Sequence, residues 1–398
     1  MSTSLLRPAL VLGLLSAVGP FAIDMYLPAM PAIGADLGAS VPAMQGTIIS
    51  YFIAFGLAQL IYGPWADQAG RKLPLYVGLT IFLIGSVLCT IAPTTGTLIA
   101  GRFVQGLGGA AVMVVPRAVI RDMHTGHDAT RMMAAIMLVI SISPFLAPMA
   151  GAGLMAIADW RAIFGVLVLA SLASLAMTRL MLAETLPVAE RQPVSIAALR
   201  TGTVKLMTHR GFLALTFLGG FAMASFFVFI ASASFVYSSA FGLTPTQFSL
   251  AFAVNALGFF SASQLAARLG LRFGAQAVMV RATFGFAVFT VGLFALGLAG
   301  AANLWVTIAG LFLANACLGL VIPTAMVMAL EEHGEIAGLA SSLGGTLQMV
   351  AGGAMIAAAA PFFDGTVLPM LAAIALCGVL ALVLSRVVAR LPEVQAPA

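Results

Sequence analysis

The sequence predicts an all-α integral membrane protein with twelve transmembrane helices in two pseudo-symmetric six-helix bundles. Three observations predict this fold class. The 398 residues are 62% hydrophobic and only 8% charged, whereas soluble domains carry about 25% charged residues. The apolar residues form long runs, each close to the roughly 20 residues that cross a bilayer as a helix. These runs lack the alternation of barrel strands, so helices are predicted rather than a membrane β-barrel.

The expected helices lie near residues 8–34, 43–66, 73–93, 97–120, 132–158, 161–182, 211–238, 246–267, 275–298, 302–329, 336–360 and 365–389. The first run is expected to be an uncleaved helix, because it exceeds signal-peptide length and contains Asp24, Pro28 and Pro31. With both termini cytoplasmic, the loop lysines and arginines fall inside and only Arg161 falls outside. The net charge of +5 therefore indicates topology, and no nucleic-acid partner is predicted.

One long polar stretch divides the chain into three predicted parts. These are an N-terminal bundle at 1–182, a cytoplasmic linker at 183–210 and a C-terminal bundle at 211–398. The two halves resemble each other weakly. Leu37–Pro42 precedes the second helix as Phe241–Pro245 precedes the eighth, and Met149–Gly153 in the fifth helix matches Met349–Gly353 in the eleventh. Transporters use such duplicated units to build a midplane site between two rocking halves.

Asp24 is the carboxylate that lies well inside a predicted span. An aspartate at the bilayer centre costs about 2.5–3.5 kcal/mol, and desolvation favours its protonated form. These costs predict that Asp24 exchanges protons during function. The alternative is a carboxyl group bonded to a helical neighbour, with no role in transport.

Arg102 lies at a similar predicted depth, in the outer half of the fourth helix. A guanidinium group near Asp24 would favour the ionised carboxylate and so control when it takes up a proton. The sequence therefore predicts proton coupling by Asp24 and Arg102. The alternative is a structural arginine that bonds backbone carbonyl groups. Whether Asp24 and Arg102 contact each other directly stays open, because the limits of the spans do not determine how each helix is rotated about its axis.

The charged turn Gly63–Leu75 joins the second and third expected helices. It resembles the corresponding loop of the major facilitator superfamily, with Trp65 where leucine is usual and Gln68 where arginine is usual. The residues that fit the family pattern are Asp67, Gly70, Arg71 and Lys72. The resemblance implies a cytoplasmic latch that gates transport, formed by Asp67, Arg71 and Asp122 at the base of the fourth helix.

Two further stretches resemble motifs of the same superfamily. Arg102–Ala111 is similar to its arginine motif in the fourth helix, and Ser143–Gly153 is similar to its antiporter motif in the fifth. Pro148 and Gly151 match the antiporter motif, while other positions carry small residues in place of glycine. The gating residues expected from these resemblances are Asp67, Gly70, Arg71, Asp122, Pro148 and Gly151.

Asp24–Pro31 and Arg102–Asp122 look like the bicyclomycin and chloramphenicol resistance group (Bcr/CflA) of twelve-helix drug:proton antiporters. The resemblance implies export of small amphipathic drugs by alternating access, from a multi-pass position in the bacterial inner membrane. It also implies that the proton gradient supplies the energy and that no cofactor is needed. A monomer in the lipid bilayer is expected.

The expected substrate contacts combine Asp24 with aromatic, methionine and amide side chains. Aromatic and methionine surfaces tolerate varied ligands, although each such residue has lipid contact or helix packing as its alternative. The candidates are Asp24, Tyr26, Tyr51, Gln59, Met113, Phe145, Phe227 and Asn255.

Two other classes of function are weighed against drug export. A metabolite or sugar transporter of the same fold would offer several polar cavity groups, and this chain offers few. An intramembrane enzyme would need a cluster of nucleophiles, acids or metal ligands at membrane depth, where only Asp24 and Arg102 are expected. A membrane sensor would carry an added soluble domain. The sequence therefore predicts neither an enzyme nor a metal site.

Overall fold

The computed structural model describes residues 3–123, 126–191, 193, 195–331 and 333–390. Within these ranges the regular structure is entirely helical, and twelve helical segments are long and apolar enough to cross a membrane. The predicted all-helical membrane fold with twelve spans is thereby confirmed. Contacts divide the chain into two compact units, Met1–Ser195 and Ile196–Ala398. The finer bundle limits at residues 182 and 211 stay predictions.

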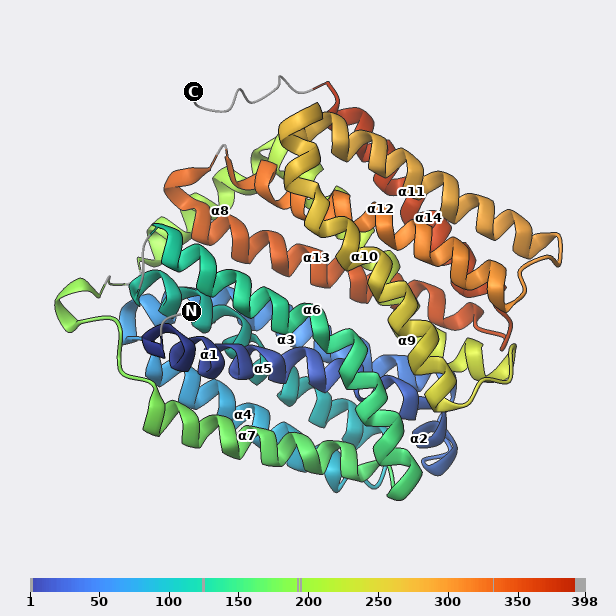
Figure 1. The fold of residues 1–398 in the computed structure, drawn as a ribbon, viewed down its shortest axis with the longest axis horizontal. Helices are drawn as coiled ribbons and strands as arrows, with labels where there is room; N and C mark the ends of the chain where they lie inside the picture. Colours follow the sequence, from blue (N-terminus) through green and yellow to red (C-terminus); the bar gives the residue numbers. More distant parts are fainter. Residues whose placement is uncertain (1–2, 124–125, 192, 194, 332, 391–398) are drawn as a thin grey trace. The chain divides into compact units, whose positions relative to one another are not determined.

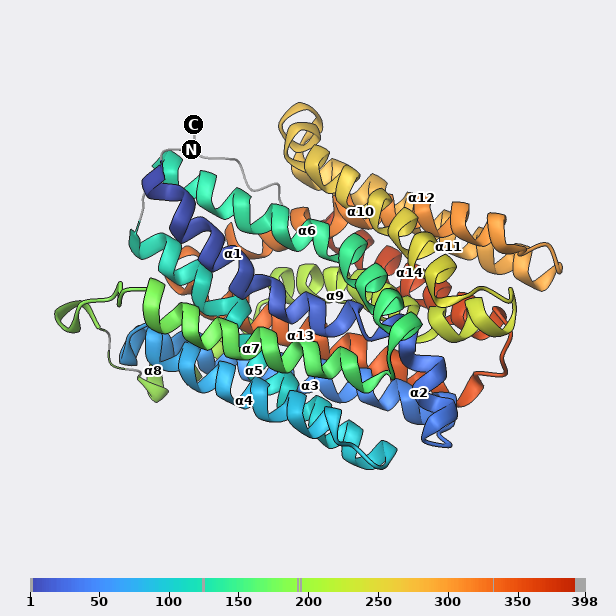
Figure 2. The same cartoon turned by 60° about the horizontal axis from the view of Figure 1, so that its bottom comes forward.

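The first unit packs around α5, which lies against both α3 and α4. α1 packs against α6, and α4 runs beside α7 (Figures 1 and 2). Its elements are α1 (Thr3–Asp24), η1 (Leu27–Ala29), α2 (Met30–Asp36), α3 (Val41–Ala69), α4 (Lys72–Thr90), α5 (Thr95–Met123), α6 (Gly126–Ile157), α7 (Arg161–Met181) and η2 (Val188–Glu190).

The second unit repeats this pairing pattern. α12 lies against α10 and α11, α9 packs against α13, and α11 packs against α14. Its elements are α8 (Ile196–Thr208), α9 (Arg210–Ser239), α10 (Pro245–Phe273), α11 (Ala275–Leu298), α12 (Leu304–Glu331), η3 (Gly334–Ile336), α13 (Ala337–Ala359), η4 (Ala360–Phe362) and α14 (Leu368–Val388). The repeated pairing supports the predicted pseudo-symmetry of the fold.

The weak sequence match before α3 and α10 has a structural cause. Both helices begin with a hydroxyl residue that accepts a hydrogen bond from the first turn, followed closely by proline. The Ser40 hydroxyl accepts from the Ala43 N–H at 3.4 Å. Thr244 forms a capping box with Gln247. Both caps satisfy backbone donors that a helix start leaves unpaired.

Most of the expected charged turn Gly63–Leu75 is helical, because α3 extends to Ala69 and α4 begins at Lys72, and several other limits shift by a few residues. Two segments differ in kind from the expected helices. The first span is irregular rather than unwound: α1 ends at Asp24 and a 3₁₀ turn, η1, precedes α2, while Tyr26, Ala29 and Met30 keep helical dihedral angles. This irregular segment is called the break below. Pro28 and Pro31 explain the break, since neither has an N–H group to donate to the carbonyl four residues earlier. The second difference is α8, a helix within the stretch that was expected to be a plain linker.

Glycines allow α5 to approach both of its neighbours at backbone distance. A methyl group at Gly106 would overlap the carbonyl oxygen of Tyr51 on α3. A methyl group at Gly108 would overlap the backbone of α4 at Gly78 and Phe82. Association of membrane helices depends on such close packing, since lipid offers no hydrophobic driving force between helices. The three helices therefore form a tightly packed block.

We expect Gly106→Ala to destabilise the protein by about 1–3 kcal/mol, the usual cost of overpacking a close contact. The apparent melting temperature in a fixed detergent measures the effect. Gly63→Ala is the matched control, because nothing lies within 4 Å of the added methyl group and alanine favours a helix. An equal loss in both variants would contradict the packing account.

Candidate functional site

Asp24 is the last residue of α1, at the break in the first span. Only 6% of the residue is exposed. No hydrogen bond or ion pair joins its carboxyl group to another part of the chain that the structure describes. The alternative of an aspartate bonded to a helical neighbour is therefore not what the structure shows. A buried carboxyl group without a partner is costly when ionised.

Arg102 reaches the same break from α5 and is fully buried. Its Nη1 donates to the carbonyl oxygen of Ala22 at 2.9 Å and to the Gln105 Oε1 at 2.5 Å. The last carbonyl groups of a helix lack donors within the helix, so Arg102 supplies one that the break leaves missing. No ion pair links Arg102 to Asp24 in the described chain. The two residues instead meet through the backbone at the end of α1. The bond to the Ala22 carbonyl is the contact expected of a structural arginine, so that alternative stays open beside the predicted role in proton coupling.

Two tyrosine rings enclose the guanidinium group. Its central carbon lies 4.9 Å from the ring centroid of Tyr26 and 4.4 Å from that of Tyr51, within the range of cation–π attraction. The Tyr26 hydroxyl lies 2.8 Å from the Thr47 Oγ1. Because Thr47 donates its own proton to the Met44 carbonyl, Tyr26 is the donor in this pair. The rings compensate part of the cost of burying a charge.

Gln105 orients Arg102 from the same helix, and sequence reasoning missed it. Its Oε1 accepts from Arg102, while its Nε2 donates to the Ser86 Oγ on α4 at 2.8 Å. Ser86 in turn donates to the Phe82 carbonyl oxygen at 2.8 Å. A glutamine three residues after a membrane-embedded arginine, on the same helix face, is the sequence signal that points to this chain of bonds.

Gly151 on α6 packs directly on the break. A methyl group at this position would overlap the carbonyl oxygen of Met25, so only glycine fits there. Pro144 and Pro148 lie inside α6 and remove two backbone donors just before this contact. The predicted gating residues Pro148 and Gly151 thus belong to the helix that covers the Asp24 break. Their gating role stays a prediction.

The other predicted substrate contacts are distributed over both units. Tyr26 and Tyr51 are fully buried around Arg102, whereas Gln59, Met113 and Phe145 are half-buried. Met113 lies against Gly19 of α1. In the second unit, Phe227 packs against Gly352 and the buried Asn255 lies beside Tyr237. Substrate contact stays a prediction for all of these residues.

Arg71 bonds both of the other charged residues of the predicted latch, Asp67 and Asp122. Its Nε and Nη2 donate to the Asp122 carboxylate at 2.7 and 3.0 Å, and its Nη1 donates to the Asp67 Oδ1 at 2.6 Å. The Arg71 side chain is 5% exposed and that of Asp122 is 14% exposed, while that of Asp67 is 52% exposed. The bidentate bond to Asp122 is therefore the stronger of the two.

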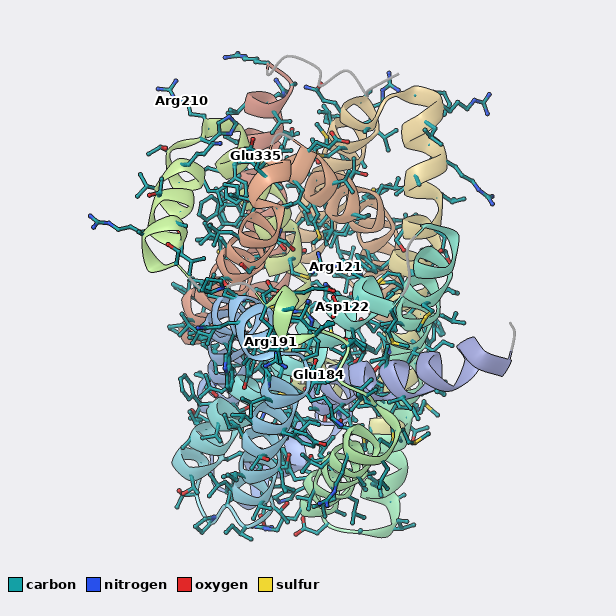
Figure 3. All side chains as sticks on the ribbon, turned by 90° about the vertical axis from the view of Figure 1, so that its left-hand side faces the viewer. Arg121, Asp122, Glu184, Arg191, Arg210 and Glu335 are labelled. Atoms are coloured by element: carbon teal, nitrogen blue, oxygen red, sulfur yellow. The ribbon has the colours of Figure 1, made fainter. Side chains whose placement is uncertain are left out.

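Glu184, which follows α7, completes this charged cluster and was not predicted. Its Oε1 accepts from the Arg71 N–H at 2.8 Å and its Oε2 accepts from the Lys72 N–H at 3.1 Å. It thereby caps the first turn of α4, where a negative charge is favoured. Thr185 donates its hydroxyl proton to the Asp122 Oδ2 at 2.9 Å. Figure 3 shows Asp122 and Glu184 near one another at this end of the unit.

Gly70 is required where the chain turns between α3 and α4. Its φ of +89° lies in the left-handed region, which glycine tolerates best. A side chain there would also meet the Glu184 carboxylate and the Arg191 guanidinium group. The four residues Asp67, Arg71, Asp122 and Glu184 are called the charged clamp below. The clamp ties the α3–α4 turn to the ends of α5 and α7.

The chain belongs to the Major Facilitator Superfamily, whose family profile matches residues 12–357. It is therefore a twelve-span membrane protein of a superfamily of transporters. This membership agrees with the family resemblance of the charged turn and of the Arg102 and Gly151 motifs.

Several curated relatives align over most of the chain. An uncharacterized MFS-type transporter YdgK of Bacillus subtilis (strain 168) is 31% identical over 346 residues, covering 86% of each chain. A bicyclomycin resistance protein homolog of Haemophilus influenzae is 29% identical and covers 93% of each chain. Multidrug resistance protein D of Escherichia coli (strain K12) is 29% identical, covering 87% of this chain and 86% of the relative.

Solved structures show the same fold. The xylose transporter XylE of E. coli in a partially occluded inward-open conformation matches with a TM-score of 0.76 at 13% identity, and all of each chain is covered. The human organic anion transporter MFSD10 matches with a TM-score of 0.71 at 18% identity, covering 96% of this chain and 99% of that one. At these identities the likeness concerns the fold alone.

We expect Glu184→Gln to lower the thermal stability at neutral pH and to flatten its dependence on acid. Burial acts to raise the pKa of Glu184, but the N–H groups of Arg71, Lys72, Leu186 and Thr185 outweigh it and hold the pKa below the ordinary 4.5. The stabilisation that ionised Glu184 gives the folded protein is therefore complete above pH 4.5. It is lost as the pH falls through the lowered pKa of Glu184 in the folded state.

Melting temperatures measured from pH 7 down to pH 3 test this expectation. Glu190→Gln is the control, since Glu190 is an exposed residue in the same stretch. The clamp assignment fails if the Glu184 variant keeps the native acid dependence.

Proposed function

We propose that the chain is a proton-coupled secondary transporter that exports small amphipathic drugs by alternating access. One observation carries the proposal: the unpartnered Asp24 carboxyl group is buried at a helix break, next to a fully buried arginine. Broken helices that expose backbone groups near charged residues are typical of substrate and ion sites in transporters. The names of the bicyclomycin and multidrug resistance relatives support drugs as the cargo.

The proposed proton step uses the carboxyl group of Asp24. Burial favours the neutral, protonated form of the carboxyl group, whereas a cationic or polar drug group bound beside it would favour the ionised form. These opposing effects allow a bound drug to shift the equilibrium between the protonated and ionised forms of Asp24. Asp24 releases its proton toward the cytoplasm as the drug binds, and protonation from the outside later displaces the drug.

Arg102 acts in this cycle as a fixed positive charge. Its bonds to Ala22 and Gln105 and its two tyrosine neighbours hold it at the break. Because Arg102 caps the end of α1, a change of charge on Asp24 acts directly on the broken segment. This is the proposed link between protonation and the movement of the first span.

The charged clamp would hold the cytoplasmic side closed in one half of the cycle. Its opening must break the bidentate bond between Arg71 and Asp122, which is mostly shielded from water. The proton gradient supplies the energy without a cofactor, and the protein works as a monomer in the bacterial inner membrane with both termini cytoplasmic. The positive-inside charge distribution supports this orientation.

A sugar or metabolite carrier of the same fold is less well supported. The likeness to a xylose transporter rests on 13% identity and concerns the fold. The half-buried candidates of the first unit are a methionine, a phenylalanine and a single glutamine. Recognition of a sugar needs several polar groups.

Asp24→Asn is expected to abolish drug movement driven by a pH gradient, because an amide cannot exchange a proton at physiological pH. Proteoliposomes with an imposed gradient and a panel of amphipathic drugs measure the effect. Asp364→Asn is the control, since Asp364 lies exposed in the turn before α14. Unchanged gradient-driven transport in the Asp24 variant would remove this residue from the mechanism.

Asp67→Asn is expected to slow turnover by roughly fivefold while drug affinity stays within about twofold, since an exposed ion pair contributes up to about 1 kcal/mol. Turnover slows because loss of the Asp67–Arg71 pair weakens the charged clamp that holds the cytoplasmic side closed. Affinity is kept because no hydrogen bond or ion pair in the described chain joins Asp67 to the Asp24 break. Transport rates and equilibrium drug binding are compared, with Asp67→Glu as the variant that keeps the charge. A large loss of affinity at normal turnover would contradict a gating role.

A further inference from the structure

α8 lies at the ends of two membrane spans of the second unit. Only His209 separates its last residue, Thr208, from Arg210, where the span of α9 begins. Its middle touches the start of another span, because a methyl group at Gly202 would overlap the Leu339 side chain near the beginning of α13. Gly202 and Thr208 are about 9 Å apart along the helix, yet both lie at a span end. α8 therefore runs along the membrane surface.

The two sides of α8 differ in their surroundings. One side packs onto the unit through Leu199, Gly202 and Leu206, and Leu206 is fully buried. The opposite side presents Val204, which is 55% exposed, and Met207, which is 41% exposed. At about 100° per residue, Arg200 lies between these two on the same arc. The helix thus has a second apolar surface that the described chain leaves uncovered.

The charge along this segment of the chain has a single sign, while the exposed Glu335 lies in η3, next to the Ile336 side chain that faces Gly202. Residues 191–210 contain four basic residues and no acidic one. No ion pair within the described ranges involves Arg200, Lys205 or Arg210. In Figure 3, Arg210 points away from the helix ends and lies apart from Glu335 of η3. A basic surface beside a bilayer attracts anionic headgroups.

We propose that the exposed face of α8 binds anionic phospholipid headgroups. Val204 and Met207 enter the boundary between headgroups and acyl chains, and Arg200 and Lys205 bind the phosphate groups. Helices with an apolar face and a basic flank lie in this plane of the bilayer. The inference needs only the membrane location of the chain, so it holds whatever the cargo and its direction.

Lipid selectivity tests the charge part of the proposal. The full-length protein is titrated with phosphatidylglycerol or phosphatidylcholine, and the bound lipids are counted by native mass spectrometry. Each basic residue near an anionic surface strengthens attachment by roughly fivefold, equivalent to about 1 kcal/mol. The double variant Arg200→Gln, Lys205→Gln is expected to lose most of the preference for phosphatidylglycerol.

A matched pair of charges provides the control. Arg268 and Arg272 are exposed at the end of α10 in the same unit, so Arg268→Gln, Arg272→Gln removes equal charge elsewhere. This variant is expected to keep most of the selectivity, and Arg200→Lys, Lys205→Arg is expected to retain it fully. Equal losses in both glutamine variants would overturn the assignment to α8.

Quenching of a fluorescent label tests the location. Thr201 is an exposed position on α8, and Thr201→Cys carries a bimane label in vesicles that contain brominated phosphatidylglycerol or brominated phosphatidylcholine. We expect stronger quenching by the brominated anionic lipid, and loss of that difference with Arg200→Gln, Lys205→Gln. Quenching by aqueous iodide but by neither brominated lipid would place α8 in water and refute the proposal.

Discussion

A carboxyl group and a guanidinium group inside the same set of spans impose the main constraint on this structure. Each costs about 2.5–3.5 kcal/mol at the bilayer centre. The fold compensates part of the cost of Arg102: Nη1 bonds a carbonyl group and an amide and two aromatic rings enclose the guanidinium group, while Nε and Nη2 are buried without a hydrogen bond in the described chain. Asp24 has no hydrogen-bond or ion-pair partner in the described chain. The arginine can therefore stay charged throughout a cycle, whereas the state of the acid depends on its surroundings. This asymmetry supports the proton exchange that we propose for Asp24.

Other features of the first unit hold Asp24 and Arg102 in place or connect them to the charged clamp. The break that exposes Ala22 to Arg102 needs Gly151 without a side chain, because α6 lies against the Met25 carbonyl. α5 carries Arg102 near one end and Asp122 at the other, about 30 Å apart along the helix. Glycine contacts hold α5 tightly to α3 and α4. A shift of this block would therefore affect both the Asp24 break and the charged clamp.

The sequence predicted the spans well, because a continuous apolar run of this length has few other structures open to it. The break at Asp24 was missed although Pro28 is its local signal, since hydrophobicity continues through it. Glu184 had no local signal, because its bond to Arg71 joins residues 113 positions apart. Burial of Tyr26 and Tyr51 around Arg102 depends on helix rotation, which the limits of the spans do not determine. The sequence did not predict α8, because a short helix of mixed polar and apolar residues has the same low hydrophobicity as a polar linker.

Proton release on drug binding tests the central claim most directly. The purified protein in weakly buffered detergent solution is mixed with a drug near neutral pH, and a pH indicator reports the protons released. The account predicts release of about one proton per drug bound by the native chain, because the drug favours ionised Asp24. It predicts none for a variant with asparagine at this position that still binds the drug. Drug binding without proton release by the native chain, or equal release by both proteins, would contradict the account.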